Sequence, residues 1–153
     1  MLLKNKWLIG SVSAALIMGA ATLEGTTTEP YEDIGGIPTV CTGHTGPDVK
    51  MGVKWTPTAC KEVLEKDLIK HGTGILQCVN VPLTQNQYNA YTLFAFNVGV
   101  GAFCKSNSVL KPLNEGKYEE ACNGMYKWTY VNGKYSKGLY NRRKVEVAMC
   151  LAK

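Results

Sequence analysis

The sequence predicts an α+β fold that is mostly helical, with one small hairpin or sheet near the N-terminus. Three observations support this prediction. The chain has 153 residues, which is enough for one domain with a substantial core. Helix-start signals and helical spacing of apolar residues recur after residue 56. Residues 31–43 are instead rich in glycine and alternate loosely, as short strands joined by turns do.

Helices are expected over most of the chain after residue 56. Thr56 and Pro57 are typical of an N-cap and a first helical position, and this helix is expected to close at Gly72. Thr84 followed by Gln87 forms a capping box before a segment that is apolar on nearly all sides, which predicts a central buried helix. The remaining expected elements are shorter helices over 103–113 and 118–128, a turn over 131–138 and a final helix over 139–151.

Residues 7–23 form an uncharged segment that follows Lys4 and Lys6. As a helix it would be about 26 Å long, slightly short of a ~30 Å hydrocarbon core. The preceding lysines predict a cytoplasmic N-terminus and an exported remainder. Nine of its residues are Gly, Ala, Ser or Thr, so the segment is only weakly hydrophobic. The alternative is a cleaved signal peptide, because residues 19–21 resemble a cleavage site.

The cysteines and the charge limit the class of protein. Six cysteines are spread evenly without zinc-site spacing and the two histidines lie far apart, so we expect no metal and no cofactor. Cysteines behind an export-like segment favour disulfides in an oxidising compartment. Six cysteines allow fifteen pairings, and the sequence does not decide among them. We favour two pairs, Cys78–Cys104 and Cys122–Cys150. The net charge of +5 admits a nucleic acid, a membrane surface or an anionic cell-wall polymer as partner.

Two acids could form a catalytic pair. Glu24 directly follows the uncharged segment and Asp33 lies nine positions further on. Glycosidic bonds are cut by two carboxyl groups that flank the bond, and a helix end followed by a hairpin could bring these two face to face. The spacing alone is weak evidence, because Glu29, Glu32 and Asp48 are acids of the same region.

A wider pattern contains both acids: Glu24-Gly25, then Asp33, Thr39 and the run 43–45, which reads Gly-His-Thr. Together with the segments 82–106 and 121–150, it resembles the phage-type lysozymes of glycoside hydrolase family 24 over residues 23–151. The resemblance implies a two-lobed, lysozyme-like domain over residues 24–153, preceded by a membrane segment over 1–23. It also implies hydrolysis of the β-1,4 bond between N-acetylmuramic acid and N-acetylglucosamine in peptidoglycan.

The resemblance also assigns roles to single residues. Glu24 is expected to be the general acid, Asp33 the carboxylate that activates or positions water, and Thr39 the hydroxyl that holds this water. A water between the two carboxyl groups would give inversion at the anomeric carbon. His44 corresponds to a structural histidine paired with Asp67, so it is left out of the catalytic set.

Three further residues, Asn97, Ser106 and Arg142, are expected to contact the substrate, with Arg142 also pairing with Glu24 at the base of a cleft. Thr42 departs from the family pattern, in which an aromatic residue is common at this position. The stretch between the two acids departs as well, because it is unusually rich in threonine. These departures concern the sugar contacts and leave the triad of Glu24, Asp33 and Thr39 intact.

A subset of these lysozymes carries an uncleaved, weakly hydrophobic signal-arrest-release segment, and residues 7–23 resemble one. The resemblance implies an inactive chain at the periplasmic face of the host inner membrane, which is later released into the periplasm and lyses the host. No cysteine precedes Cys41, so refolding of the segment is the expected switch. The expected partners are peptidoglycan and, before release, the inner membrane; no nucleic acid is expected, and the protein should be a monomer. The alternatives are a secreted lysozyme with a cleaved leader and an inactive cell-wall-binding protein.

Overall fold

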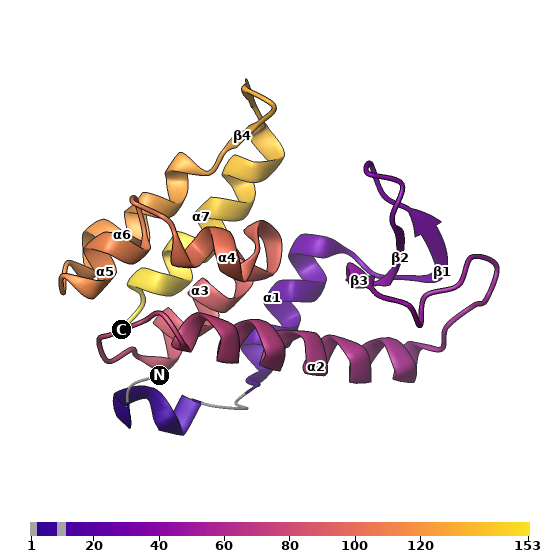
Figure 1. The fold of residues 1–153 in the computed structure, drawn as a ribbon, viewed down its shortest axis with the longest axis horizontal. Coiled ribbons are helices and arrows are strands. Elements are labelled where there is room, and N and C mark those ends of the chain that lie inside the picture. The colour runs from indigo at the N-terminus through magenta and orange to yellow at the C-terminus, as the bar shows by residue number, and fades with distance from the viewer. Residues whose placement is uncertain (1–2, 9–11) are drawn as a thin grey trace. The chain divides into compact units, whose positions relative to one another are not determined.

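The computed structural model describes residues 3–8 and 12–153. The chain divides into two compact units (Figure 1). The first comprises Val12–Leu68, and the second comprises Ile69–Lys153 together with the described residues that precede Val12. Within the described ranges, no helix combines the length and the apolar character that a membrane crossing needs.

The Val12–Leu68 unit is a small sheet accompanied by helices. Its elements are helix α1 (Ala14–Glu24), strands β1 (Thr27–Glu32), β2 (Pro38–Cys41) and β3 (His44–Thr45), and the first part of helix α2 (Pro57–Leu76). The three strands are antiparallel in the order β1-β2-β3, and Tyr31 lies opposite Thr39. The predicted β element near the N-terminus is confirmed, although its first strand begins at Thr27 rather than at residue 31.

Helix α1 contains the C-terminal half of the uncharged segment. The Ser13 hydroxyl accepts a hydrogen bond from the Leu16 N–H at 3.1 Å and so caps the first turn. Leu16 and Ala20 lie four residues apart and are both buried, so one face of the helix is packed. Gly25 ends the helix with a φ of 72°, in the region that favours glycine. Glu24 is therefore the last helical residue, as predicted.

Helix α2 does not close at Gly72, and that prediction is wrong: the helix continues to Leu76. Gly72 has a packing role instead. A Cβ atom at this position would lie 2.0 Å from the Tyr88 hydroxyl oxygen of the central helix. The glycine thus permits a close approach of two helices, because any larger residue would collide with the tyrosine.

The second unit is helical apart from one hairpin. It contains the 3-10 helix η1 (Leu3–Leu8), the end of α2, α3 (Gln85–Val98), α4 (Val100–Cys104), α5 (Leu110–Asn114), α6 (Tyr118–Gly124), the 3-10 helix η2 (Met125–Lys127), strands β4 (Tyr130–Val131) and β5 (Lys134–Tyr135), and α7 (Lys137–Leu151). Helix α3 is the central helix: Thr84 and Gln87 form the predicted capping box, and residues 88–95 are all buried. The prediction of a central buried helix is confirmed.

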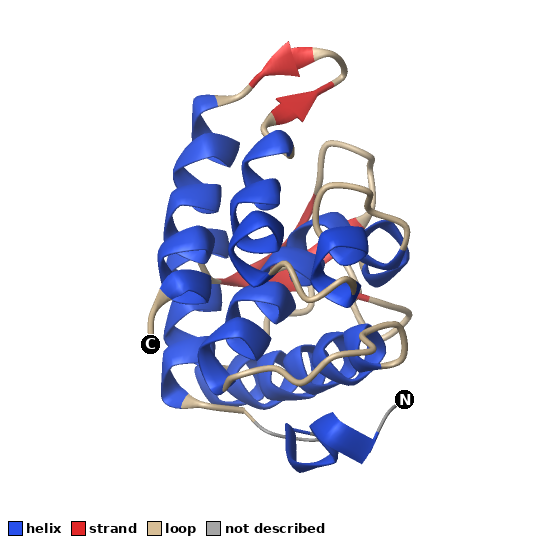
Figure 2. Ribbon diagram, turned by 90° about the vertical axis from the view of Figure 1, so that its left-hand side faces the viewer, coloured by secondary structure: helices blue, strands red, loops and turns tan. Residues whose placement is uncertain are grey.

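The sequence overestimated the length of the shorter helices. The single helix expected over 103–113 is two helices, because Ser106 interrupts it: its hydroxyl donates to the Phe103 carbonyl and accepts from the Leu110 N–H. The helix expected over 118–128 is α6 followed by a 3-10 turn. The predicted turn over 131–138 is in part a β-hairpin, in which Asn132 and Gly133 both have positive φ, as a tight two-residue turn requires (Figure 2).

The first described residues pack into this second unit. Asn5 is 1% exposed; its side-chain amide donates to the Val81 carbonyl at 2.8 Å and accepts from the Leu83 N–H at 3.0 Å. Leu8 is fully buried in the hydrophobic core that surrounds α3. Hence η1 is part of the folded unit.

Three disulfides join all six cysteines. They are Cys41–Cys60 in the first unit, and Cys78–Cys104 and Cys122–Cys150 in the second. Both pairs that we favoured from the sequence are confirmed. The Cys41–Cys60 disulfide links the sheet to α2, because Cys41 ends β2 and Cys60 lies in the first turn of that helix.

We expect the Cys122→Ser, Cys150→Ser double variant to lower the free energy of unfolding by about 3 kcal/mol, because the crosslink limits the unfolded chain. The two residues are 28 positions apart and connect α6 with α7. Urea denaturation of the oxidised protein, followed by circular dichroism, measures the difference. The wild-type protein after reduction should be less stable than the double variant, because it has lost all three crosslinks. Equal stability of the double variant and the oxidised wild type would contradict this expectation.

Candidate active site

The carboxylate of Glu24 is held at the end of α1. A Cβ atom placed on Gly43 would lie 3.9 Å from Glu24 Oε2, so this oxygen lies beside the turn between β2 and β3. The Glu24 side chain is half-buried. Gly43 has a φ of 76°, a backbone conformation that favours glycine. The predicted acid therefore lies at the end of α1 and next to the β2–β3 turn.

Asp33 follows β1 and organises the loop that leads to β2. Its Oδ1 accepts hydrogen bonds from the backbone N–H groups of Gly35, at 2.8 Å, and Ile37, at 2.9 Å. Its own N–H donates to the Ile37 carbonyl at 3.0 Å. These bonds fix the carboxylate in one orientation, because rotation of the side chain would break both bonds to Oδ1.

Thr39 shares the backbone of Ile37 with Asp33. Its hydroxyl donates to the Ile37 carbonyl oxygen at 2.9 Å, and the side chain is almost fully buried in β2. The Ile37 peptide groups therefore bond to both predicted catalytic residues, by N–H to Asp33 and by C=O to Thr39. Because the Thr39 hydroxyl donates its hydrogen to the Ile37 carbonyl, its oxygen can still accept a hydrogen bond from another donor, such as a water.

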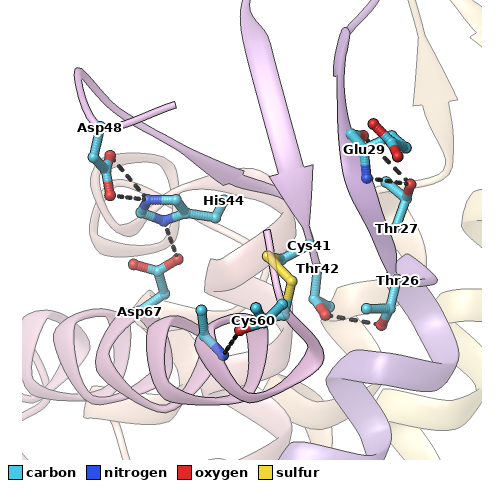
Figure 3. Close-up of a disulfide and its surroundings, with 11 residues drawn as sticks. Thr26, Thr27, Glu29, Cys41, Thr42, His44, Asp48, Cys60 and Asp67 are labelled. Atoms are coloured by element: carbon cyan, nitrogen blue, oxygen red, sulfur yellow. Dashed lines mark hydrogen bonds and ion pairs between the residues drawn. A yellow bond between two sulfur atoms is a disulfide. The ribbon is translucent and has the colours of Figure 1, made fainter. Parts of the chain in front are cut away.

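Two links hold the sheet in place: one joins it to the segment that follows α1, and the other joins it to α2 (Figure 3). The hydroxyl oxygens of Thr26 and Thr42 lie 3.0 Å apart, two residues after Glu24 and one residue before Gly43. The Cys41–Cys60 disulfide ties the end of β2 to α2. Sequence reasoning noted Thr42 only as a departure from the family. The structure shows that it forms a hydrogen bond that brings the Glu24 segment to the β2–β3 turn.

His44 lies between two carboxylates. Its Nδ1 is 2.7 Å from Asp67 Oδ2 and its Nε2 is 3.0 Å from Asp48 Oδ2 (Figure 3). The centroid of the Trp55 ring lies 5.6 Å from that of the His44 ring. The predicted structural pair with Asp67 is confirmed, and Asp48 is a second partner that the sequence did not indicate. Burial opposes the charged imidazole, but hydrogen bonds and charge from Asp67 and Asp48 outweigh it, so the pKa of His44 is raised.

The other three predicted site residues lie in the second unit. Asn97 is exposed, and its Oδ1 accepts a hydrogen bond from Arg143 Nη2. Ser106 is buried, and its hydroxyl serves the helix break described above. Arg142 is half-buried on α7. Their contacts with substrate and the pairing of Arg142 with Glu24 stay predictions. Nowhere in the described part of the chain do three metal-ligating side chains gather to hold an ion.

The arrangement in the first unit belongs to a class of site. One carboxyl group stands at a helix end, a second is fixed by a hairpin loop, and a hydroxyl acceptor is joined to the second through one backbone segment. Such a set suits the cleavage of a glycosidic bond by an acid and an activated water.

Comparisons with known proteins give the family. The phage lysozyme family model matches residues 21–146. A SAR-endolysin of Pseudomonas phage phiKMV is 40% identical over 151 residues, covering 96% of this chain and 92% of that protein. A SAR-endolysin of Escherichia phage Mu is 45% identical over 127 residues, covering 83% of this chain and 73% of that protein.

Solved structures agree with the sequence comparisons. The muramidase domain of SpmX from Asticaccaulis excentricus superposes with a TM-score of 0.86 at 30% identity, covering 94% of this chain and 99% of that one. A P22 lysozyme superposes with a TM-score of 0.83 at 34% identity, covering 93% and 99%. The chain belongs to the phage lysozyme family, and it is a glycoside hydrolase that cleaves peptidoglycan.

We expect the raised pKa of His44 to make stability depend on pH. A group whose pKa is higher in the folded state binds its proton more tightly there, so its contribution is fully present below the unfolded pKa of about 6.5. The contribution is lost as the pH rises through the folded pKa. Urea denaturation at a series of pH values from 5.5 to about 9 should therefore show stability falling over this range.

The Asp48→Asn variant is the matched test, because Asp48 is partly exposed and its loss leaves the Asp67 bond in place. The His44 pKa, measured by NMR titration, should move down in this variant. In a His44→Gln variant, the free energy of unfolding should no longer fall with rising pH through the titration of residue 44. A wild-type His44 pKa at or below the unfolded value would contradict the assignment.

Proposed function

We propose that Glu24, Asp33 and Thr39 form the catalytic set of this peptidoglycan hydrolase. Glu24 donates a proton to the glycosidic oxygen as the bond to the leaving sugar breaks. Asp33 accepts a proton from a water that attacks the anomeric carbon, and Thr39 orients this water by accepting its second hydrogen. The bond cleaved is the β-1,4 linkage between N-acetylmuramic acid and N-acetylglucosamine, and attack by water gives inversion.

The single observation that carries this assignment is the shared backbone of Ile37. It holds Asp33 by Oδ1, so Oδ2 is the oxygen that we assign to the water. It also turns Thr39 into an acceptor. A base and an acceptor for the same water need a fixed mutual geometry, because small displacements in a reacting site are costly in rate.

We infer further that the N-terminal segment first holds the protein at the periplasmic face of the inner membrane and then leaves the membrane. The SAR-endolysin relatives support this inference by their name. The fold supports it as well, because Asn5 and Leu8 are buried in one unit and Leu16 and Ala20 in the other. We assign these contacts to the released protein in the periplasm, which lyses the host as a monomer.

A leader cleaved after Ala21 is the competing account, and the structure argues against it. The cut would fall within α1 and would remove the Ser13 cap together with both buried residues of the helix. Glu24 would then be the third residue of a new N-terminus with no helix to hold it. Terminal residues without such support are poorly ordered, and a catalytic acid needs a rigid base.

We expect Glu24→Gln to reduce the hydrolysis of purified sacculi by at least ~100-fold, because the amide cannot supply the proton for the leaving group. Release of reducing ends measures the rate, and NMR of fresh wild-type products reports the anomeric configuration. Glu29→Gln is the matched control: Glu29 is an exposed acid of the same region that pairs with Lys54 at 3.4 Å, and its loss should leave the rate unchanged. Full activity of folded Glu24→Gln would remove this residue from the acid role.

We expect the triple variant Ala14→Leu, Ala15→Leu, Thr22→Leu to remain in the membrane. These three positions are exposed in α1, so the folded domain can accept larger side chains there. On the insertion scale the changes together favour the membrane by about 1–2 kcal/mol, or roughly tenfold. The variant should be exported, uncleaved and inactive, and host lysis should be delayed; blotting of membrane and periplasmic fractions measures this.

The same three positions changed to glutamine provide the control. This variant has equal side-chain bulk but no added affinity for lipid, so it should not be retained by the membrane. A cleaved leader gives a different result: the leucine variant would still yield a shorter soluble protein. A soluble wild-type form that starts at Thr22 and lyses cells normally would refute the retained segment.

A further inference from the structure

Four tyrosines form a connected surface on the second unit, which we call the tyrosine patch: Tyr126, Tyr130, Tyr135 and Tyr140. The ring centroids of Tyr126 and Tyr140 are 5.6 Å apart, those of Tyr140 and Tyr135 are 6.4 Å apart, and those of Tyr135 and Tyr130 are 6.0 Å apart. Tyr130 and Tyr135 are 63% and 57% exposed. They lie on the β4–β5 hairpin, which leaves the helices at the start of α7 (Figure 2).

The surroundings of the tyrosine patch are positively charged. Residues 121–145 contain six Lys or Arg and no Asp or Glu. Arg143 is buried against Glu146, so the exposed charge comes mainly from lysines. Lys144 Nζ lies 6.0 Å from the Tyr140 ring centroid. The exposed lysines of this segment are Lys127, Lys134, Lys137 and Lys144.

Hairpin stability alone does not account for the patch. Tyr130 and Tyr135 are cross-strand partners, and a ring pair of this kind stabilises a short hairpin. In that role, the edge of one ring packs against the face of the other. More than half of each side chain is still open to solvent, and the neighbouring Val131 is 52% exposed. Exposed aromatic surface beside a row of cations is typical of an interaction site.

The chemistry of the patch favours a glycan over a lipid surface. A hairpin that enters a membrane would carry apolar side chains at its tip, but this tip is Asn132-Gly133 followed by Lys134. Tyrosine rings offer flat apolar faces with a polar edge, which match the C–H faces and hydroxyl groups of a pyranose ring. Lysines suit a polymer that also carries carboxylates.

We propose that the tyrosine patch and its lysines form an accessory binding surface for peptidoglycan. Sugar rings of the glycan strand stack on Tyr130 and Tyr135, and carboxylates of the stem peptides pair with Lys134 and Lys137. The surface binds the polymer and takes no part in the chemistry at Glu24 and Asp33. The proposal rests on the proposed function for the identity of the polymer.

Binding of the full-length Glu24→Gln protein to purified sacculi, measured by co-sedimentation, tests the surface without turnover. Adding Tyr130→Ala and Tyr135→Ala should weaken binding by about fivefold to tenfold, whereas Tyr130→Phe and Tyr135→Phe should retain it, because the stacking faces remain. Thermal melting shows whether each variant is folded. Vesicles of phosphatidylglycerol serve as the lipid probe, and their binding should not depend on the tyrosines.

A second variant tests the lysines beside the tyrosine patch, and it tests the proposal by itself if the alanine variant does not fold. Lys134→Gln with Lys137→Gln should bind native sacculi several-fold less tightly but should equal its parent on sacculi whose carboxyl groups have been amidated. Unchanged sacculus binding by the folded alanine variant, or by the lysine variant, would overturn the proposal. A loss confined to the vesicles would overturn it in favour of a lipid surface. Failure of the catalytic assignment is seen separately, as full turnover by the Glu24→Gln protein.

Discussion

Burial of one face of α1 is the constraint on which the position of Glu24, the proposed acid, depends. Leu16 and Ala20 are buried, and Glu24 is the last residue of the same helix. The acid therefore has its place only where the helix has formed and docked. Gly25, the Thr26–Thr42 bond and the Gly43 turn then complete its surroundings. The C-terminal half of the segment that we assign to the membrane is therefore part of the helix that carries Glu24.

The composition of α1 affects its affinity for lipid and its surroundings in the folded protein. Five of its eleven residues are Gly or Ala, which weakens its affinity for lipid. In the folded unit, a pocket of about 290 Å³ that is open to solvent lies beside this helix, lined by Ile17 and Ala21 of α1, Thr28 of β1 and Leu64 of α2.

The features that could be predicted from the sequence are those that depend on residues close together in the chain. The Thr84 capping box, the helix end at Glu24 and the hairpin after it follow from neighbouring residues, and the family pattern supplied Glu24, Asp33 and Thr39 as the candidate triad. Features that depend on distant residues were missed. Gly72 was interpreted as a helix end because its contact with Tyr88 lies in another helix. The bonds of Asn5 to Val81 and Leu83 span more than seventy positions. The main-chain bonds of Ile37 could not be predicted, since they use no side chain of that residue.

The second unit contains a buried ion pair where α3 and α7 pack together. Arg143 and Glu146 are fully buried, with Arg143 Nε 3.1 Å from Glu146 Oε2 and the guanidinium 4.9 Å from the Phe94 ring centroid. Burying such a pair is costly unless its remaining donors are satisfied, and Asn97 accepts one of them. A guanidinium only donates, so the oxygen of the Asn97 amide must face it and the amide nitrogen must point the other way. The buried pair therefore fixes which group the exposed Asn97 on α3 offers to its surroundings: the N–H groups of its amide, which are hydrogen-bond donors.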